Sequence, residues 1–257
     1  MTSQAMKSND PNFPELLPLQ WDSEFFNVPV YNFDLAGYQT VADAHLEILN
    51  SQKGISCRSL IYIHTTPSAL ELNNKIKSLG ATHLDTRNEF ELLLDSPLKQ
   101  KKYSLLQKPD IYTGNMNDQL AQLAITAGEY SRFRKDTNIS DEYFEQLYRL
   151  WMARSVDLDL ADNVIVTRTE SGDISGMVTV KSTNKTGYIG LIAVSKGYQG
   201  QGIGSELLSY ALEYFDQQNC GRIRVVTQNE NKPACHHYRN FGFKVIKQTS
   251  TFHLWRD

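Results

Sequence analysis

Residues 188–215, YIGLIAVSKGYQGQGIGSELLSYALEYF, place a glycine-rich turn between an apolar strand-like run and a helix-like run. Gly200, Gly202 and Gly204 lack the Cβ atoms that would keep the backbone away from a bulky anion. The helix that follows directs its first unpaired N–H groups, and the positive end of its dipole, toward the same place. The pattern therefore predicts a binding site for a pyrophosphate group.

The spacing of these glycines distinguishes several interpretations of the turn. A dinucleotide-binding turn and a plain tight turn also use glycine, but Q-x-x-G-x-G differs from both G-x-G-x-x-G and the Walker loop G-x-x-x-x-G-K-[ST]. Set after LIAVSKGYQ, residues 191–199, the turn resembles the coenzyme A pyrophosphate loop of the GNAT N-acyltransferases. The resemblance implies an α/β (α+β) chain with the GNAT fold, in which helices flank a mixed central sheet. It also implies that acetyl-CoA or another short acyl-CoA is the co-substrate.

The composition of the chain limits which partners and which cellular compartment can be expected. The chain has 257 residues and a net charge of −3, which argues against broad contact with nucleic-acid phosphates. Its start, MTSQAMKSNDPNFPELLPLQ, is polar and proline-rich, so no signal peptide is expected. No apolar run reaches the roughly 18 residues of a membrane span, so no membrane insertion is expected. Three cysteines without C-x-x-C spacing predict reduced, buried thiols, no metal site and a cytoplasmic protein.

A self-comparison reveals a partial internal repeat. Residues 60–92 align without gaps to residues 222–254 at a constant offset of 162, which pairs Gly80 with Gly242. Both copies read as a strand, a helix ended by glycine, and then a pair of strands. A chance match between short αβ segments is the alternative, which the unbroken register disfavours. Only the second copy follows a glycine loop, so the first is expected to have no cofactor machinery.

These patterns predict three parts of the chain. Residues 1–14 are expected to be a flexible N-terminus, residues 15–100 a degenerate GNAT-like αβ half-domain, and residues 101–257 the acyltransferase domain. In the last part we expect strands near 103–106 and at 163–169, 174–181, 187–194, 222–227, 244–247 and 251–255. The expected helices are 118–127, 141–156 (capped by Asp141), 205–215 and 233–241.

The GNAT resemblance assigns the coenzyme to the turn and the strand before it. It implies that the pantetheine arm lies along that strand like an added strand, while the pyrophosphate meets the amides of the turn. The residues assigned in this way are Leu191, Ile192, Ala193, Val194, Gln199, Gly200, Gln201, Gly202, Ile203, Gly204, Ser205, Asn231 and Tyr238. Among them, Ile192 and Val194 are the expected backbone partners of the arm. An ordinary buried central strand is the alternative, and the two are compatible.

Tyr238 is the candidate catalytic residue. It lies in the second signature shared with the family, N-x-x-A/P…Y…G-F, between Asn231 and Phe243. The resemblance implies that this tyrosine reaches the coenzyme sulfur, where a phenol with a pKa of about 10 can protonate the departing thiolate. A helix tyrosine packed against the sheet is the alternative. His236 and His237 are interpreted as structural or surface residues, and water-mediated deprotonation of the amine is expected to suffice.

A second resemblance concerns the acceptor. The stretch WDSEFFNVPV at residues 21–30, the linker at residues 130–134 and the glycine-loop phrase together resemble the dTDP-fucosamine acetyltransferase family and related dTDP-amino-sugar N-acyltransferases. The resemblance implies transfer of an acetyl group, or of a 3-hydroxybutyryl group, to the amine of a dTDP-linked dideoxyamino sugar. Such sugars are precursors of surface polysaccharides such as lipopolysaccharide O-antigen or capsule.

Four linker residues are candidates for binding the sugar nucleotide: Tyr130, Arg132, Phe133 and Arg134. The arginines are suited to clamping a diphosphate, and either aromatic ring is suited to stacking on thymine. A solvated junction between a helix and a loop is the alternative. A protein or small-amine acetyltransferase and a non-catalytic acyl-CoA-binding module are the alternative functions, and a homodimer is left open.

Overall fold

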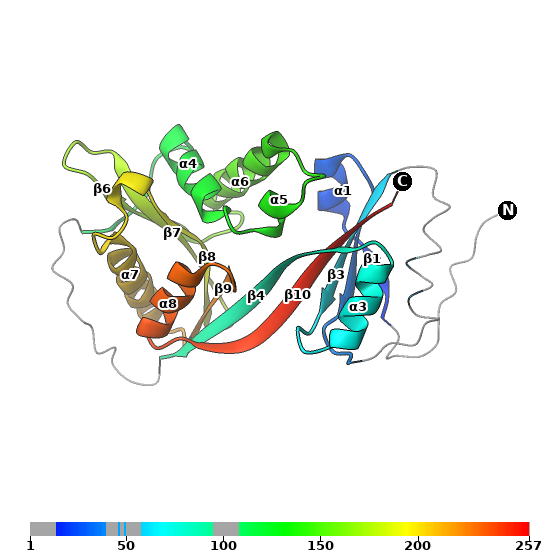
Figure 1. Cartoon of the computed structure of the whole chain (residues 1–257). Helices are drawn as coiled ribbons and strands as arrows, with labels where there is room; N and C mark the ends of the chain where they lie inside the picture. The colour runs from blue at the N-terminus through cyan, green and yellow to red at the C-terminus, as the bar shows by residue number, and fades with distance from the viewer. Residues whose placement is uncertain (1–13, 40–45, 47–48, 50–57, 95–107, 257) are drawn as a thin grey trace. The chain divides into compact units, whose positions relative to one another are not determined.

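The computed structural model describes residues 14–39, 46, 49, 58–94 and 108–256 (Figure 1). The chain divides into two compact units. The first unit comprises residues 1–86 and 248–257, and the second unit comprises residues 87–247. Each unit contains part of a mixed β-sheet together with helices. The predicted α/β fold class is therefore confirmed. Within the described residues, no helix combines the length and apolar character that a membrane crossing requires.

The second unit contains the strands predicted from 163 to 227, together with β5 and the part of β4 from Arg87 onward. They lie in the order β4-β9-β8-β7-β6-β5. Their bounds are β4 Thr82–Leu93, β5 Asp110–Ile111, β6 Asn163–Arg168, β7 Ile174–Thr183, β8 Thr186–Val194 and β9 Arg222–Gln228. All neighbours in this group pair antiparallel except β8 and β9, which are parallel. The strands predicted from 163 to 227 are confirmed to within two residues, whereas the strand expected near 103–106 lies outside the described residues.

Helices cover both faces of this sheet. Figure 1 shows α4, α5 and α6 on one side and α7 and α8 on the other. Their bounds are α4 Asp118–Ala127, α5 Arg132–Lys135, α6 Asp141–Val156, α7 Ile203–Gln217 and α8 Lys232–Asn240. The predicted cap of α6 was wrong by one position: the Ser140 side chain accepts the Tyr143 N–H at 3.3 Å, and Asp141 is the first helical residue. A serine hydroxyl in the extended conformation reaches that N–H, and an acidic residue then sits favourably in the first turn.

The first unit contains the strand order β1-β2-β3-β10. Its elements are β1 Leu16–Pro18, α1 Gln20–Phe26, β2 Val30–Leu35, β3 Ser59–Thr65, α3 Leu70–Ser78 and β10 Lys244–Arg256. One sheet face packs with α3 in an apolar core that includes Ile61, Ile63, Ile76, Phe252 and Leu254. The sequence predicted two strands at 244–247 and 251–255, but β10 is a single strand, because nothing at Gln248–Ser250 breaks its extended backbone.

The internal repeat is visible in the element bounds. Helices α3 and α8 begin and end 162 residues apart, and so do the first residues of β4 and β10. Each helix is followed by a glycine in the left-handed region, Gly80 at φ +94° and Gly242 at φ +91°. A side chain would be strained at that φ, so each glycine ends its helix for the same reason. The predicted order of strand, helix and glycine is confirmed in both copies.

The two copies exchange their last strands. In the first unit β10 pairs with β3, and Phe252 lies opposite Ile63. In the second unit β4 pairs with β9, and Phe90 lies opposite Val225, which is the same antiparallel pairing moved by one repeat. The last strand of each copy therefore lies beside the first strand of the other copy. The domain limits expected at residues 14 and 100 stay predictions, since residues 1–13 and 95–107 are outside the described part.

Candidate active site

The strands β8 and β9 separate halfway along their length. Their parallel register runs from Thr186 opposite Arg222 to Ile189 opposite Val225. From Gly190 to Val194, the described register pairs β8 with β7 alone. The backbone of this segment therefore has an open edge on the β9 side. Open strand edges present N–H and C=O groups that an amide-containing arm can join as an added strand.

A bulge in β8 marks the point of separation. Gly190 and Leu191 lie opposite Thr179, where the β7–β8 register shifts, and the Leu191 N–H donates to the Thr179 hydroxyl at 2.8 Å. A Cβ on Gly190 would lie 2.6 Å from that hydroxyl oxygen, so only glycine fits. An extra residue in one strand bends it and increases its twist. This local geometry explains why the end of β8 leaves β9.

The four strand residues assigned to the pantetheine arm occupy this segment. The side chains of Leu191 and Ala193 are buried, while those of Ile192 and Val194 are half-buried. The Val194 carbonyl already accepts a hydrogen bond from the Gln199 side-chain amide at 3.1 Å. An arm that bonds to Val194 must therefore share or displace this amide. The roles of all four residues stay predictions.

The glycine loop connects this strand to α7. After the short helix η2, Lys196–Tyr198, Gln199 to Gly202 are exposed, and the Gln201 side chain donates to the Gly197 carbonyl at 3.3 Å. Gly200 and Gly202 have φ values of +78° and +89°, and a Cβ at either position would meet nothing within 4 Å. Glycine is required there by the left-handed backbone and not by crowding. Gly202 is the N-cap of α7, so the loop ends where the helix N–H groups begin.

The first turn of α7 meets both β8 and α8. A Cβ on Gly204 would lie 3.8 Å from Val194 Cγ2 and 4.0 Å from His237 Nε2. The remaining turn residues, Ile203 and Ser205, are buried and half-buried, and the Ser205 N–H donates to the Gly202 carbonyl at 2.8 Å. The open edge of β8, the N-terminus of α7 and one face of α8 therefore converge on one place.

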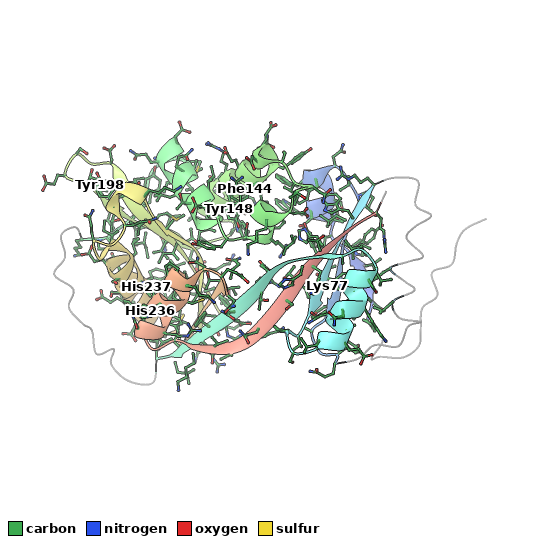
Figure 2. The ribbon with its side chains drawn as sticks, in the orientation of Figure 1. Lys77, Phe144, Tyr148, Tyr198, His236 and His237 are labelled. Atoms are coloured by element: carbon green, nitrogen blue, oxygen red, sulfur yellow. The ribbon has the colours of Figure 1, made fainter. Side chains whose placement is uncertain are left out.

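His237 is a residue that the sequence did not assign to this place. Figure 2 shows it on α8 beside His236. Its Nε2 atom is buried near the Gly204 backbone without reaching hydrogen-bond geometry, and its ring lies 5.0 Å from that of Phe241. A signal was present in the sequence, since His237 and Phe241 are spaced to share a helix face.

Acidification is expected to destabilise the protein through His237. Burial, aided by His236, lowers the pKa of His237 below 6.5, although the Gly204 backbone acts in the opposite direction. The unfolded chain then binds this proton more readily, so the stabilising contribution is present above the unfolded pKa and is lost as the pH falls. The melting temperature, measured from pH 8 to pH 5, should fall less in His237→Gln than in the wild type.

The matched control for this prediction is His236→Gln. His236 is exposed on the same helix and its Nε2 lies 2.9 Å from the Asn240 amide. This variant should keep most of the wild-type pH dependence, because burial is the largest cause of the His237 shift. Identical pH profiles for the wild type and His237→Gln would contradict the prediction.

Tyr238 lies in the core between α8 and the sheet. Its side chain is 2% exposed and its ring centroid is 5.6 Å from that of Phe90 and 5.7 Å from that of Phe243. Burial, with a smaller contribution from the Cys235 thiol, raises the pKa of the Tyr238 phenol above its ordinary value. The phenol therefore stays protonated at neutral pH, and burial makes it a weaker acid than an exposed tyrosine. Its assignment to catalysis stays a prediction.

Asn231 has a structural role in addition to its predicted one. Its side-chain oxygen accepts the Ala234 N–H at 3.2 Å and so caps α8. Pro233 follows in the first turn, where its missing N–H costs nothing. Asn231 thus fixes the start of the helix that carries Tyr238.

Three of the predicted sugar-nucleotide residues, Arg132, Phe133 and Arg134, lie in the short helix α5, where the sequence predicted a linker. Tyr130 precedes this helix. The Arg132 guanidinium lies 4.5 Å from the Phe133 ring centroid, and the Arg134 guanidinium lies 5.2 Å from that of Phe144. Arg134 is also ion-paired with Asp141. Phe133 is only 8% exposed, so its ring packs inside the unit and has little surface for a base. The half-buried Tyr130 is better placed for stacking.

Two ion pairs connect this segment to the separated strands. Glu129 pairs at 3.0 Å with Lys196, just after β8, and Lys135 pairs at 3.5 Å with Glu230, just after β9. The segment 129–135 is therefore joined at one end to the strand that precedes the glycine loop and at the other to the strand that precedes α8. Such partly exposed pairs contribute little stability, but they fix where the segment lies.

The sequence that forms this site matches a known protein family. Residues 130–243 match the model of the Acetyltransferase (GNAT) family. The match begins at Tyr130 and ends at Phe243, so it includes the segment with α5, the open edge of β8, the glycine loop and Tyr238. This part of the chain is therefore similar to the GNAT acetyltransferases.

Two curated relatives and one solved structure refine the comparison. N-alpha-acetyltransferase 30 of Saccharomyces cerevisiae is 26% identical over 127 residues, which are 46% of this chain and 70% of that protein. The dTDP-fucosamine acetyltransferase of Escherichia coli O6:H1 is 32% identical over 138 residues, which are 53% of this chain and only 58% of that protein. A tandem GNAT protein from the clavulanic acid biosynthesis pathway has a TM-score of 0.56 at 13% identity, with 88% of this chain and 75% of that chain covered. The last comparison concerns the fold alone.

Proposed function

We propose that the second unit transfers a short acyl group from acyl-CoA to an amine. The observation that carries this proposal is the separation of β8 from β9 directly before the glycine loop. An open strand edge accepts the amides of a pantetheine arm, and the N-terminus of α7 accepts a pyrophosphate at the end of the same path. Acetyl-CoA is the favoured donor because the matched family and both relatives are acetyltransferases.

In this proposal the acyl transfer proceeds through bond changes and proton transfers at particular atoms. The acceptor amine attacks the thioester carbonyl carbon, which forms a C–N bond, and the tetrahedral centre then expels the sulfur as a thiolate. The Tyr238 hydroxyl gives its proton to that sulfur, the proton of the attacking amine leaves to water, and the Tyr238 phenolate regains a proton from water. A tyrosine is protonated at neutral pH, so Tyr238 holds the proton that this step requires.

We further propose that the acceptor is the amine of a dTDP-linked dideoxyamino sugar used for surface polysaccharide. The relative that acetylates dTDP-fucosamine by name favours this acceptor, and so do the two arginines and Tyr130 around α5. Acetyl is the favoured acyl group and 3-hydroxybutyryl is the alternative. A protein N-terminal amine is the second candidate acceptor, because the yeast relative is named an N-alpha-acetyltransferase.

A thiol-release assay separates these candidates. The protein is incubated with acetyl-CoA, a thiol reagent and one acceptor at a time: dTDP-amino sugars, the free amino sugars, or short peptides with free N-termini. Turnover on dTDP-amino sugars alone supports the proposed acceptor, and turnover on peptides supports the second candidate. Acetyl-CoA binding without turnover on any amine would leave only a non-catalytic acyl-CoA-binding module.

Replacing Arg132 or Arg134 by Ala is expected to raise the KM for the dTDP sugar by about 10- to 100-fold. A charge-assisted hydrogen bond to a diphosphate is worth about 1.5–3 kcal/mol, and Lys should restore only part of it because it lacks the planar fork. The KM for acetyl-CoA should stay nearly unchanged, which steady-state kinetics can measure for both substrates.

The matched control is Arg149→Ala, which removes another arginine that is ion-paired at 3.6 Å, in this case with Asp118 on α4. Its kinetics should be those of the wild type. An unchanged KM for the dTDP sugar in both Arg132→Ala and Arg134→Ala would show that neither arginine binds the sugar nucleotide. Equal activity on free and dTDP-linked amino sugars would reject nucleotide recognition altogether.

A further inference from the structure

The first unit has a buried polar face. In β3 and β10, the residues that face α3 are apolar, whereas the opposite face carries polar side chains at successive positions. Thr251 lies directly opposite His64, and His253 directly opposite Tyr62. All four side chains are at least nine-tenths buried. This face of the sheet is therefore closed to water although it is not apolar.

Several contacts organise this face. The Tyr62 hydroxyl donates to the Asp22 carboxylate of α1 at 3.1 Å, and the rings of Tyr62 and His253 lie 4.7 Å apart. The Thr251 hydroxyl lies 3.4 Å from His64 Nδ1. Hydroxyl, imidazole and carboxylate groups are thus brought together by two neighbouring strands and one short helix.

Asp85 of β4 belongs to the same face. Its neighbour Thr86 has its hydroxyl 3.4 Å from that of Ser250. Ser250 lies opposite Thr65, which donates to Asn73 of α3, so Thr86 points toward the α3 side. Successive side chains of a strand point to opposite faces. Asp85 therefore points to the polar face.

The Asp85 carboxyl group has no hydrogen-bond partner among the described residues. The residue is 1% exposed, and neither of its two oxygens makes a hydrogen bond. The large majority of buried side-chain polar atoms in native proteins have a hydrogen-bond partner, and a buried carboxylate without donors is strongly unfavourable. A folded chain that retains such a group is destabilised by it, which suggests that a ligand supplies the missing donors.

We propose that Asp85 anchors a binding site for a protonated primary amine on the polar face of the first unit. An ammonium group supplies both the compensating charge and up to three N–H donors. The described residues contain no group of three or more side chains arranged to hold a metal ion, so an organic cation is the better match.

Two variants test the site through stability and binding together. Asp85→Asn keeps the shape of the side chain, and Asp85→Leu removes its polar atoms. Removing an unpaired buried carboxyl should raise the melting temperature of the unliganded protein by about 2–4 °C. The matched control is Asn88→Leu on the same strand: Asn88 is fully buried and donates to Asn229 at 3.4 Å, so its loss should lower the melting temperature.

Binding is measured with two matched pairs of probes, each an amine and its neutral N-acetyl form: a dTDP-amino sugar, and glucosamine. For the wild type we expect the amine of at least one pair to bind about 10- to 100-fold more tightly than its N-acetyl form, as one charge-assisted interaction predicts. In Asp85→Asn this preference should disappear. Titration calorimetry serves for the dTDP sugar and thermal shift for glucosamine.

The outcomes are distinct. A preference for glucosamine without any binding of the dTDP-amino sugar would reject the proposed acceptor and keep the Asp85 site. Destabilisation of both Asp85 variants would show that the carboxyl is structural and overturn the site. An amine preference that persists in Asp85→Asn, or a wild type with no preference in either pair, would overturn it as well.

Discussion

The Gly202→Glu variant is expected to lose measurable affinity for acyl-CoA. Gly202 is the N-cap of α7, and a glutamate there puts a carboxylate where the pyrophosphate is proposed to bind. Loss of two charge-assisted hydrogen bonds, each worth about 1.5–3 kcal/mol, corresponds to at least about a 100-fold weaker complex. Titration calorimetry with acetyl-CoA measures this directly. Affinity near that of the wild type would reject the pyrophosphate site.

Gly172→Glu is the matched control for backbone strain. Gly172 lies in the turn between β6 and β7 at φ +92°, and Gly202 has φ +89°; a Cβ at either position meets nothing within 4 Å. Both variants therefore place the same charged side chain on a similarly strained backbone, at a cost of about 1–3 kcal/mol. Only Gly202→Glu should lose the coenzyme, whereas both should lose comparable stability.

Tyr238→Phe is expected to lower kcat by about 10²- to 10⁴-fold and to change the affinity for acetyl-CoA much less. The proposed proton transfer matters as the thiolate forms, so its loss affects the transition state more than the ground state. The core should tolerate the change, because the ring contacts with Phe90 and Phe243 are kept. Steady-state kinetics on the identified acceptor and calorimetry with acetyl-CoA provide the two measurements.

Tyr214→Phe is the control for loss of a tyrosine hydroxyl. Tyr214 lies 11 residues beyond Ile203 on α7, about 16 Å along the helix, and its hydroxyl accepts from Asn163 at 3.1 Å. This variant should keep its kcat. A wild-type kcat in Tyr238→Phe would mean that the tyrosine packs in the core and that the thiolate leaves without assistance.

Local patterns predicted most elements of the second unit. Helix α4 was predicted with both of its ends, and the structure shows Asn117 as its N-cap and Gly128 as its C-cap. The glycine loop was equally clear, since Gly200 and Gly202 occupy left-handed backbone that few other residues tolerate. Short-range sequence signals of this kind depend only on neighbouring residues, so they can be read without the fold.

Long-range features could not be predicted in this way. The internal repeat showed that β4 and β10 correspond, but pairing of each with the other copy depends on contacts between distant segments. Burial of Phe133 and of the Asp85 carboxyl is likewise a property of the assembled units. His237 of α8 lies near the first turn of α7. The spacing of residues along the chain does not predict which helices pack together, so this proximity could not be predicted.

The exchange of β4 and β10 also affects the order of events during synthesis. On the ribosome, β3 emerges long before β10, so its β10-facing edge has no antiparallel partner while the second unit is being made. Domains commonly fold from the N-terminus onward as they emerge. Here the first unit has to wait for the second, because residues 248–256 complete its sheet. A nascent chain therefore exposes an unpaired strand edge throughout that interval, and such edges are where newly made proteins aggregate or need a chaperone.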